Sequence, residues 1–248
     1  MELGIPRVGS RLRPQTRVDQ HFPAKPVTDA VVIVSSHEGL RRALNLSIAT
    51  GALIAVSPLM LLIAVVVKCT SRGPIIYSQT RVGLDRRGRS AASRNLRRSN
   101  DLGGRPFRIY KFRTMCVNAE QLTGAVWATR GDPRVTLVGR FLRQYRLDEL
   151  PQLFNVIKGD MNIVGPRPER PTIFADLRTK VADYAVRQRA RPGITGLAQI
   201  SQQYDSSLDD VRNKVRHDVE YLRRQSLGED LRIMLKTIPV VLFRRGGW

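Results

Sequence analysis

The sequence predicts an α/β protein made of a re-entrant membrane helix-break-helix, interfacial amphipathic helices and a small cytoplasmic domain. Three observations carry this prediction. They are an uncharged run over residues 44–67, strand-like apolar stretches within residues 73–83 and 107–115, and apolar side chains at helical spacing within residues 137–157. We expect this domain to contain a small sheet and to carry the acidic pair described below at the start of its second amphipathic helix.

The uncharged run of 24 residues, 44–67, is long enough to cross a bilayer. As one helix it would extend about 36 Å, whereas the hydrocarbon core is roughly 30 Å thick. Pro58 follows Ser57 in its middle and lacks the N–H that a helix needs, so we expect a kink or a break there. Positive residues flank both ends, which favours two cytoplasmic ends: Arg41, Arg42, Lys68 and Arg72. We therefore expect a re-entrant hairpin over residues 41–72, with an ordinary kinked transmembrane helix as the alternative.

Positive charge dominates the chain as a whole. Lys and Arg number 42 against 21 acidic residues, a formal charge of +21, which predicts an anionic partner such as nucleic acid, anionic lipid headgroups or a phosphorylated substrate. Residues 1–40 are polar and contain proline, so we expect a flexible N-terminal arm. Residues 73–248 should form the main domain, with a solvent-exposed basic loop inserted at residues 85–105. The two cysteines and three histidines follow no spacing typical of a metal or redox site.

Asp148 and Glu149 stand side by side in this basic chain, although neighbouring like charges repel. They would mark either a helix start, where acids complement the helix dipole, or a catalytic pair. Nearby arginines would keep a carboxylate ionised, as a nucleophile or a metal ligand requires: Arg143, Arg146 and Arg167. The strand-like residues 107–115 would add three cations to one anionic site, or leave them as surface charges: Arg108, Lys111 and Arg113.

Seven sequence blocks, in one order, resemble the bacterial sugar transferase family, the monotopic phosphoglycosyl transferases that begin glycan assembly on a polyprenyl phosphate. The resemblance runs from about Leu40 to Val241 and leaves out the N-terminal arm and the basic loop. The blocks are the hydrophobic hairpin with Ser57-Pro58, "GPIIYSQTRVG", "YKFRTM", "DPRVTLVGRFLR", "LDELPQLFNVIKGDMNIVGPRPE", "RPGITGLAQI" and "HDVEYLRRQSLGEDLRIMLKT".

This resemblance implies an enzyme that transfers a sugar 1-phosphate from a UDP-sugar to polyprenyl (undecaprenyl) phosphate and releases UMP. The reaction would initiate synthesis of a surface glycan such as exopolysaccharide, capsule or O-antigen. The resemblance implies that Asp148 is the nucleophile that forms a covalent aspartyl phosphosugar. It implies that Glu149 assists and holds Mg²⁺, with Asp148 as a second candidate ligand. The implied phosphate-binding residues are Lys111, Arg113, Arg143 and Arg167. Phosphoryl transfer depends on positioning and charge neutralisation, so a divalent metal beside several arginines suits it.

Blocks further along the chain have two interpretations. By the resemblance, the donor or its nucleoside would contact Arg191, Gly193, Thr195, Gln199 and Asp218. Fixed proline-glycine turns and a helix-surface carboxylate are equally simple structural explanations. The chain departs from the family at Asn45, where an acid usually follows the basic pair, so an ion pair with Arg41 or Arg42 is lost.

The expected location is the cytoplasmic face of a bacterial inner membrane. The expected partners are polyprenyl phosphate, a UDP-sugar, anionic membrane lipid and downstream glycosyltransferases, and no nucleic acid is expected. The alternative is a non-catalytic, membrane-anchored basic protein that binds anionic lipid or nucleic acid. That alternative accounts for the charge and the hydrophobic run but not for adjacent acids in an arginine-rich neighbourhood.

Overall fold

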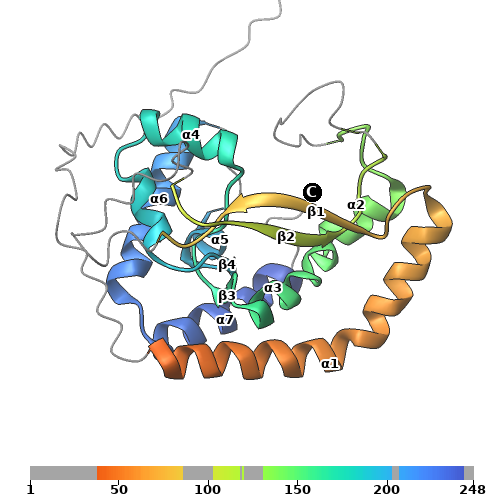
Figure 1. Ribbon diagram of the computed structural model, residues 1–248, viewed down its shortest axis with the longest axis horizontal. Coiled ribbons are helices and arrows are strands. Elements are labelled where there is room, and N and C mark those ends of the chain that lie inside the picture. Colours follow the sequence, from red (N-terminus) through yellow and green to blue (C-terminus); the bar gives the residue numbers. More distant parts are fainter. Residues whose placement is uncertain (1–37, 86–102, 118, 120–130, 203–206, 243–248) are drawn as a thin grey trace, which may run out of the picture.

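The computed structural model describes residues 38–85, 103–117, 119, 131–202 and 207–242. The N-terminal arm expected over residues 1–40 and the basic loop expected over residues 85–105 lie almost wholly outside the described residues. The arrangement of the elements is shown in Figure 1.

The described part of the chain is a mixed α/β structure, as predicted. Its elements are α1 (Glu38–Thr70), β1 (Ile76–Val82), β2 (Pro106–Phe112), α2 (Leu137–Gln144), η2 (Leu147–Glu149), α3 (Gln152–Lys158), β3 (Asn162–Val164), α4 (Pro171–Lys180), η3 (Tyr184–Arg189), β4 (Gly193–Thr195), α5 (Leu197–Ser201), α6 (Leu208–Arg224) and α7 (Leu227–Leu242). β1 pairs with β2 in an antiparallel ladder, and β3 pairs with β4 in a parallel one. The strand and helix positions expected from the sequence therefore correspond to β1, β2, α2 and α3.

Helix α1 is one continuous helix that bends and does not break. Figure 1 shows it running along the lower edge of the domain and then turning upward. Pro58 lies inside it and cannot donate to the carbonyl of Ile54, four residues earlier. The hydroxyl of Ser57 donates to that same carbonyl at 2.8 Å. The Ser-Pro pair thus bends the helix and also satisfies the acceptor that proline leaves free.

The start of α1 is fixed to the domain by buried polar contacts. Arg41 forms an ion pair with Asp230 at 2.8 Å. Asn45 accepts a hydrogen bond from the backbone N–H of Ile163 at 2.6 Å. Asn45, where the sequence departs from the family pattern, thus has a structural role of its own. The acid that pairs with Arg41 is instead Asp230, far along the chain.

Both halves of α1 pack against the domain. Ala49, in the first half, belongs to a cluster with β2 and α3, whereas Ile63 and Val67, in the second half, pack with Phe112 and Leu142. The outward face is apolar and exposed, which is unusual for a surface in contact with water: Ile54 is 70% exposed, Leu61 68% and Leu62 60%. Within the described residues, α1 is the one helix long and apolar enough to cross a membrane.

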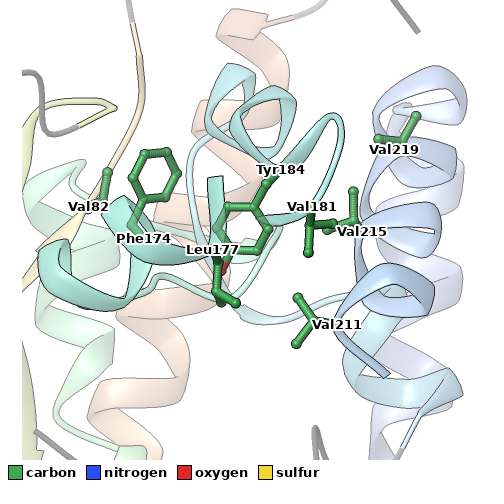
Figure 2. Packing of buried hydrophobic residues seen from close by; sticks show 8 residues of the cluster. All are labelled: Val82, Phe174, Leu177, Val181, Tyr184, Val211, Val215 and Val219. Atoms are coloured by element: carbon green, nitrogen blue, oxygen red, sulfur yellow. The ribbon is translucent and has the colours of Figure 1, made fainter. Parts of the chain in front are cut away.

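A separate hydrophobic cluster joins α4, η3 and α6 to the end of β1. Figure 2 shows its members: the ring of Phe174 lies beside Val82, and the ring of Tyr184 lies between Phe174 and the valines of α6. Tyr184 is 1% exposed and its ring centroid lies 5.5 Å from that of Phe174. This cluster makes the end of the domain that carries α6 a rigid support.

Strands β3 and β4 approach each other closely because glycine stands at their contact, Gly165 directly after β3 and Gly193 at the start of β4. A Cβ atom added to Gly165 would lie 2.3 Å from the carbonyl oxygen of Arg191, and one added to Gly193 would lie 2.1 Å from the backbone nitrogen of Gly165. The proline-glycine segments that could have been simple turns therefore form a close contact between two strands, with turns at its ends.

Candidate active site

The acidic pair lies on a short helical turn between α2 and α3, directly before α3, where the sequence placed it at the start of a helix. Asp148 and Glu149 end the turn η2, which packs on the core through Leu147 and Leu150. Arg146, just before the turn, adopts the left-handed conformation, with φ 54° and ψ 21°. A non-glycine residue held in this region is strained, and such strain is concentrated at functional sites.

Two cations from different parts of the chain meet at the pair. Lys111, on β2, lies 2.6 Å from Glu149 Oε1 and 3.7 Å from Asp148 Oδ2. Arg167, after β3, donates to Glu149 Oε1 at 2.7 Å and to Oε2 at 3.4 Å. The side chains of Asp148 and Glu149 are 9% and 7% exposed, so these contacts act where water screens little.

The two carboxyl groups respond to this setting in opposite directions. Burial raises the pKa of Asp148 above its ordinary 3.8, and Lys111 offsets that effect only in part. Burial would raise the pKa of Glu149 as well, but the charges of Arg167 and Lys111 outweigh it and hold that pKa well below its usual value. Glu149 is therefore held ionised, as expected. The charges of Arg143 and Arg167 favour the ionised form of Asp148, but burial outweighs them and raises its pKa.

Asn155 connects the strand that carries Lys111 to the helix that follows the acidic pair. Its side-chain amide donates to the carbonyl of Arg108 at 2.7 Å, and its side-chain oxygen accepts from the N–H of Tyr110 at 3.0 Å. Asn155 is fully buried on α3, so it ties the free edge of β2 to the helix that follows the pair. Sequence reasoning missed this role, since an asparagine in a helix looks like a surface residue.

The other cations expected at the site separate into two groups. Arg143 donates to the hydroxyl of Thr114 at 2.9 Å, and its charge favours the ionised form of Asp148. Arg113 turns away: its guanidinium donates to carbonyls at the end of α1, including that of Ser71 at 2.7 Å. Arg108 is exposed on the opposite face of β2 from Lys111, because successive strand residues point to opposite sides.

Residues expected at the donor or nucleoside site have partners of their own in the structure. Arg191 pairs with Glu38 at 3.2 Å, and Thr195 shares a hydrogen bond of 2.8 Å with Thr237. Gly193 forms the strand contact described above, and Gln199 donates to the carbonyl of Ile194 at 3.3 Å. Asp218 pairs with Arg187, and both side chains are almost completely buried. These partners belong to α1, α7, β4 and η3, whereas the acidic pair lies on η2.

The pair could hold a magnesium ion only together with a ligand from the substrate. Among the described residues, no group of three or more His, Cys, Asp or Glu side chains could form a metal cage. Magnesium often uses one or two carboxylates plus phosphate oxygens from the substrate. Two adjacent carboxylates fit that mode, and within the described structure Glu149 Oε2 accepts only a long bond, 3.4 Å from Arg167.

Comparison with known proteins gives one consistent result. The family model described as bacterial sugar transferase matches residues 36–244. The chain is 43% identical over 203 residues to the UDP-N-acetylgalactosamine-undecaprenyl-phosphate N-acetylgalactosaminephosphotransferase of Aeromonas hydrophila, covering 82% of this chain and 44% of that protein. It is 37% identical over 213 residues to the undecaprenyl-phosphate glucose phosphotransferase of Komagataeibacter xylinus, covering 84% of this chain and 37% of that protein.

A shorter relative matches over nearly its whole length. This is the exopolysaccharide production protein ExoY of Sinorhizobium fredii, 38% identical over 222 residues, which cover 84% of this chain and 88% of that protein. The chain thus spans less than half the length of the first two relatives, at 44% and 37%, and most of the third.

Proposed function

Because the chain belongs to the bacterial sugar transferase family, we propose that it transfers a sugar 1-phosphate from a UDP-sugar to undecaprenyl phosphate and releases UMP. The names of the relatives support this donor and acceptor class, and that of ExoY supports a role in starting a surface glycan. The observation that carries the proposal is the buried Asp148–Glu149 pair held between Lys111 and Arg167. A diphosphate brings negative charge that such cations can neutralise.

The reaction proceeds in two displacements at one phosphorus. An Asp148 carboxylate oxygen attacks the sugar-proximal phosphorus of the donor, and the bond to the bridging oxygen breaks, so that UMP leaves with that oxygen. A phosphate oxygen of undecaprenyl phosphate then attacks the same phosphorus. The bond to Asp148 breaks, the carboxylate is restored and the product is undecaprenyl-diphosphate-sugar. Asp148 suits the first step better than Glu149, whose Oε1 is occupied by both Lys111 and Arg167.

Glu149 has a supporting role in this scheme. Its two cations keep it charged and fix its orientation, so it can set the position of Lys111 beside Asp148. Magnesium, when bound by the pair and by the donor diphosphate, would neutralise charge that develops on the phosphate oxygens. Lys111 and Arg143 would bind phosphate oxygens and thereby orient the donor for attack.

The membrane path of α1 is a re-entrant one in this proposal. Arg42 at its start donates to the carbonyls of Val156 and Ile157, and Ser71 just after its end accepts from Arg113. Both ends are therefore bonded to the same domain, which supports entry into and exit from one face of the bilayer. Positive residues at both flanks support the cytoplasmic face of the inner membrane, where α7 would lie among anionic headgroups with Leu231, Leu235 and Ile238 exposed.

The test is release of UMP from a panel of UDP-sugars by membranes that contain the protein, with magnesium and undecaprenyl phosphate. We expect release with at least one donor. With a radiolabelled donor and no undecaprenyl phosphate, the label should remain on the protein, and Asp148→Asn should abolish this adduct because an amide is a poor nucleophile at phosphorus. Absence of UMP with every donor would contradict the activity. Retained turnover in folded, membrane-inserted Asp148→Asn would contradict the nucleophile.

A further inference from the structure

The segment that carries Arg167 is held by its backbone as well as by its side chains. It contains two prolines, Pro166 and Pro168, which fix φ on either side of Arg167. Four consecutive carbonyls each accept a hydrogen bond: Pro166 from Gly193 N at 3.0 Å, Arg167 from Arg187 Nη2 at 3.1 Å, Pro168 from Arg81 Nη1 at 3.1 Å, and Glu169 from Val82 N at 2.9 Å. The segment 166–169 thus has little freedom to move.

Arg187 makes the contact to Arg167 itself. Its side chain is fully buried and its Nε lies 2.5 Å from Asp218 Oδ2, whose side chain is 1% exposed. The guanidinium lies 4.9 Å from the ring centroid of Tyr184, a member of the cluster in Figure 2. The planar guanidinium of Arg187 therefore connects helix α6, through Asp218, to the backbone of Arg167, whose side chain binds Glu149.

We propose that Arg187, oriented by Asp218, is a positioning residue that fixes the backbone of Arg167 so that its guanidinium reaches Glu149. The inference rests on the proposed function, since the distance between Arg167 and Glu149 matters there for catalysis. Asp218, expected from the sequence at the donor site, then acts two steps away from the acidic pair. Its contribution passes through Arg187 and Arg167 and involves no contact with the substrate.

A purely structural role for this pair is a weak alternative on physical grounds. Removing two charges from water is unfavourable, and replacing a buried ion pair by apolar residues of similar size is often neutral or stabilising. Such a pair gains its value from geometry, because a guanidinium donates in fixed directions and a hydrophobic side chain does not. Arg187 uses two of these directions, one toward Asp218 and one toward the carbonyl of Arg167.

The central experiment is a double-mutant cycle on the purified full chain, with UMP release as the measurement. Arg187→Met should lower kcat/KM by on the order of a hundredfold, because a displacement of about 1 Å in a positioned group costs that much. In the Arg167→Ala background, the same substitution should lower kcat/KM by less than about threefold, since its target is already gone. An equal loss in both backgrounds would overturn the proposal.

Two further variants keep the test informative if Arg187→Met does not fold. Asp218→Asn keeps the shape and an acceptor for Arg187, and it should show the same coupling to Arg167→Ala with a smaller loss. The double variant Arg187→Met with Asp218→Leu should regain the stability of the parent, since no charge is left unpaired, but not its turnover. A stable double variant with parental turnover would overturn the positioning role.

Arg41→Met is the matched control, because Arg41 is another buried arginine paired with an aspartate, Asp230, at 2.8 Å. Its loss should be the same with and without Arg167→Ala. Amide hydrogen exchange in the peptide spanning residues 165–170 gives a readout that does not depend on activity. Exchange should be faster in Arg187→Met than in Arg41→Met. Faster exchange together with an inactive parent protein would refute the proposed function alone, whereas unchanged exchange would refute the inference alone.

Discussion

Asp148 and Glu149 are neighbours in the chain, yet their surroundings give them different chemistry. Glu149 takes the short contacts, 2.6 Å from Lys111 and 2.7 Å from Arg167, whereas Asp148 has only the longer contact of 3.7 Å with Lys111. Two titratable groups whose pKa values are driven apart are typical of a site in which each has its own role. Glu149, which has two short contacts with cations, is suited to orienting them, and Asp148, which has one longer contact, is suited to attack on a substrate.

The opposite pKa shifts predict how adduct formation depends on pH. Asp148 must lose its proton to attack, and burial raises its pKa, so kcat/KM for adduct formation should fall as pH decreases through a value above the ordinary 3.8. Lys111→Met removes the largest charge that favours the ionised form, so this limb should move to higher pH. Glu149→Gln removes a like charge and should move it to lower pH. Shifts in the same direction for both variants would contradict the assignment of the limb to Asp148.

The cations near the pair should divide into catalytic and structural groups. Lys111→Ala and Arg167→Ala should each lower kcat by about 10²- to 10³-fold with little change in protein level, because they act on charge in the reaction. Arg113→Ala should instead destabilise the fold by about 1–3 kcal/mol, because carbonyls at the end of α1 lose a buried donor. Steady-state kinetics together with thermal unfolding would separate the two effects. Near-normal turnover for Lys111→Ala and Arg167→Ala would refute the site.

The sequence indicated the centre of the site but not its supports. Adjacent acids in a basic chain, and a resemblance through ordered motifs, predicted Asp148, Glu149, Lys111 and Arg167, which the structure brings together. The sequence could not tell which arginine side chains are buried, because a buried guanidinium and a solvated one look alike in it. Arg113 was therefore expected at the phosphates, and the buried pairing of Arg187 with Asp218 was not foreseen. Both arginines are held by hydrogen-bond partners that lie far away in the sequence: Arg113 by Ser71 and Arg187 by Asp218.

Ser57 and Pro58 together shape the bend of helix α1. Proline removes the donor for the carbonyl of Ile54, and serine replaces it at 2.8 Å, on a stretch where no water would be available inside a membrane. Ser57→Ala should destabilise the protein by on the order of 1 kcal/mol, as loss of a hydrogen bond in a membrane does.

Pro58→Leu provides the complementary test of the same bend. Leucine restores the N–H and removes the ring clash, so α1 should straighten. In that background the carbonyl of Ile54 has its helical donor, and Ser57→Ala should then have almost no effect on thermal unfolding. A full additional loss from Ser57→Ala in the Pro58→Leu protein would mean that the serine acts on something other than this carbonyl.

Secondary structure was the part of the fold that the sequence predicted best. Apolar spacing located α2 and α3, and alternation located β1 and β2, because local periodicity reports which face is buried. The parallel contact of β3 and β4 was not foreseen, because it joins three-residue strands far apart in the chain through the glycines at positions 165 and 193. The sequence also favoured a break at Pro58, whereas α1 is continuous there and both of its halves pack on the domain.

The whole molecule has its membrane element attached along its length to the domain that carries the site. The first turns of α1 contact β3 through Asn45, just before the segment that holds Arg167. Near the end of α1, the carbonyl of Val67 accepts a hydrogen bond from Arg113, two residues beyond Lys111. The helix that would enter the bilayer therefore touches both chain segments that supply cations to the acidic pair. If α1 enters the bilayer as proposed, these contacts link the helix directly to the segments around the acidic pair.

The same attachment predicts the membrane topology, and the native cysteines make it measurable. Cys69 lies exposed in the last turn of α1 and serves as a tag for that end once Cys116 is replaced by serine. For the other end, Gly39→Cys in a protein lacking Cys69 and Cys116 adds a tag where a Cβ atom meets nothing within 4 Å. Because both ends are bonded to one domain, a membrane-impermeant maleimide should label both tags in inside-out vesicles and neither in right-side-out vesicles. Equal labelling of both tags in detergent is the control for access. Labelling of the two tags from opposite sides would mean that α1 spans the membrane and that its contacts with the domain do not persist there.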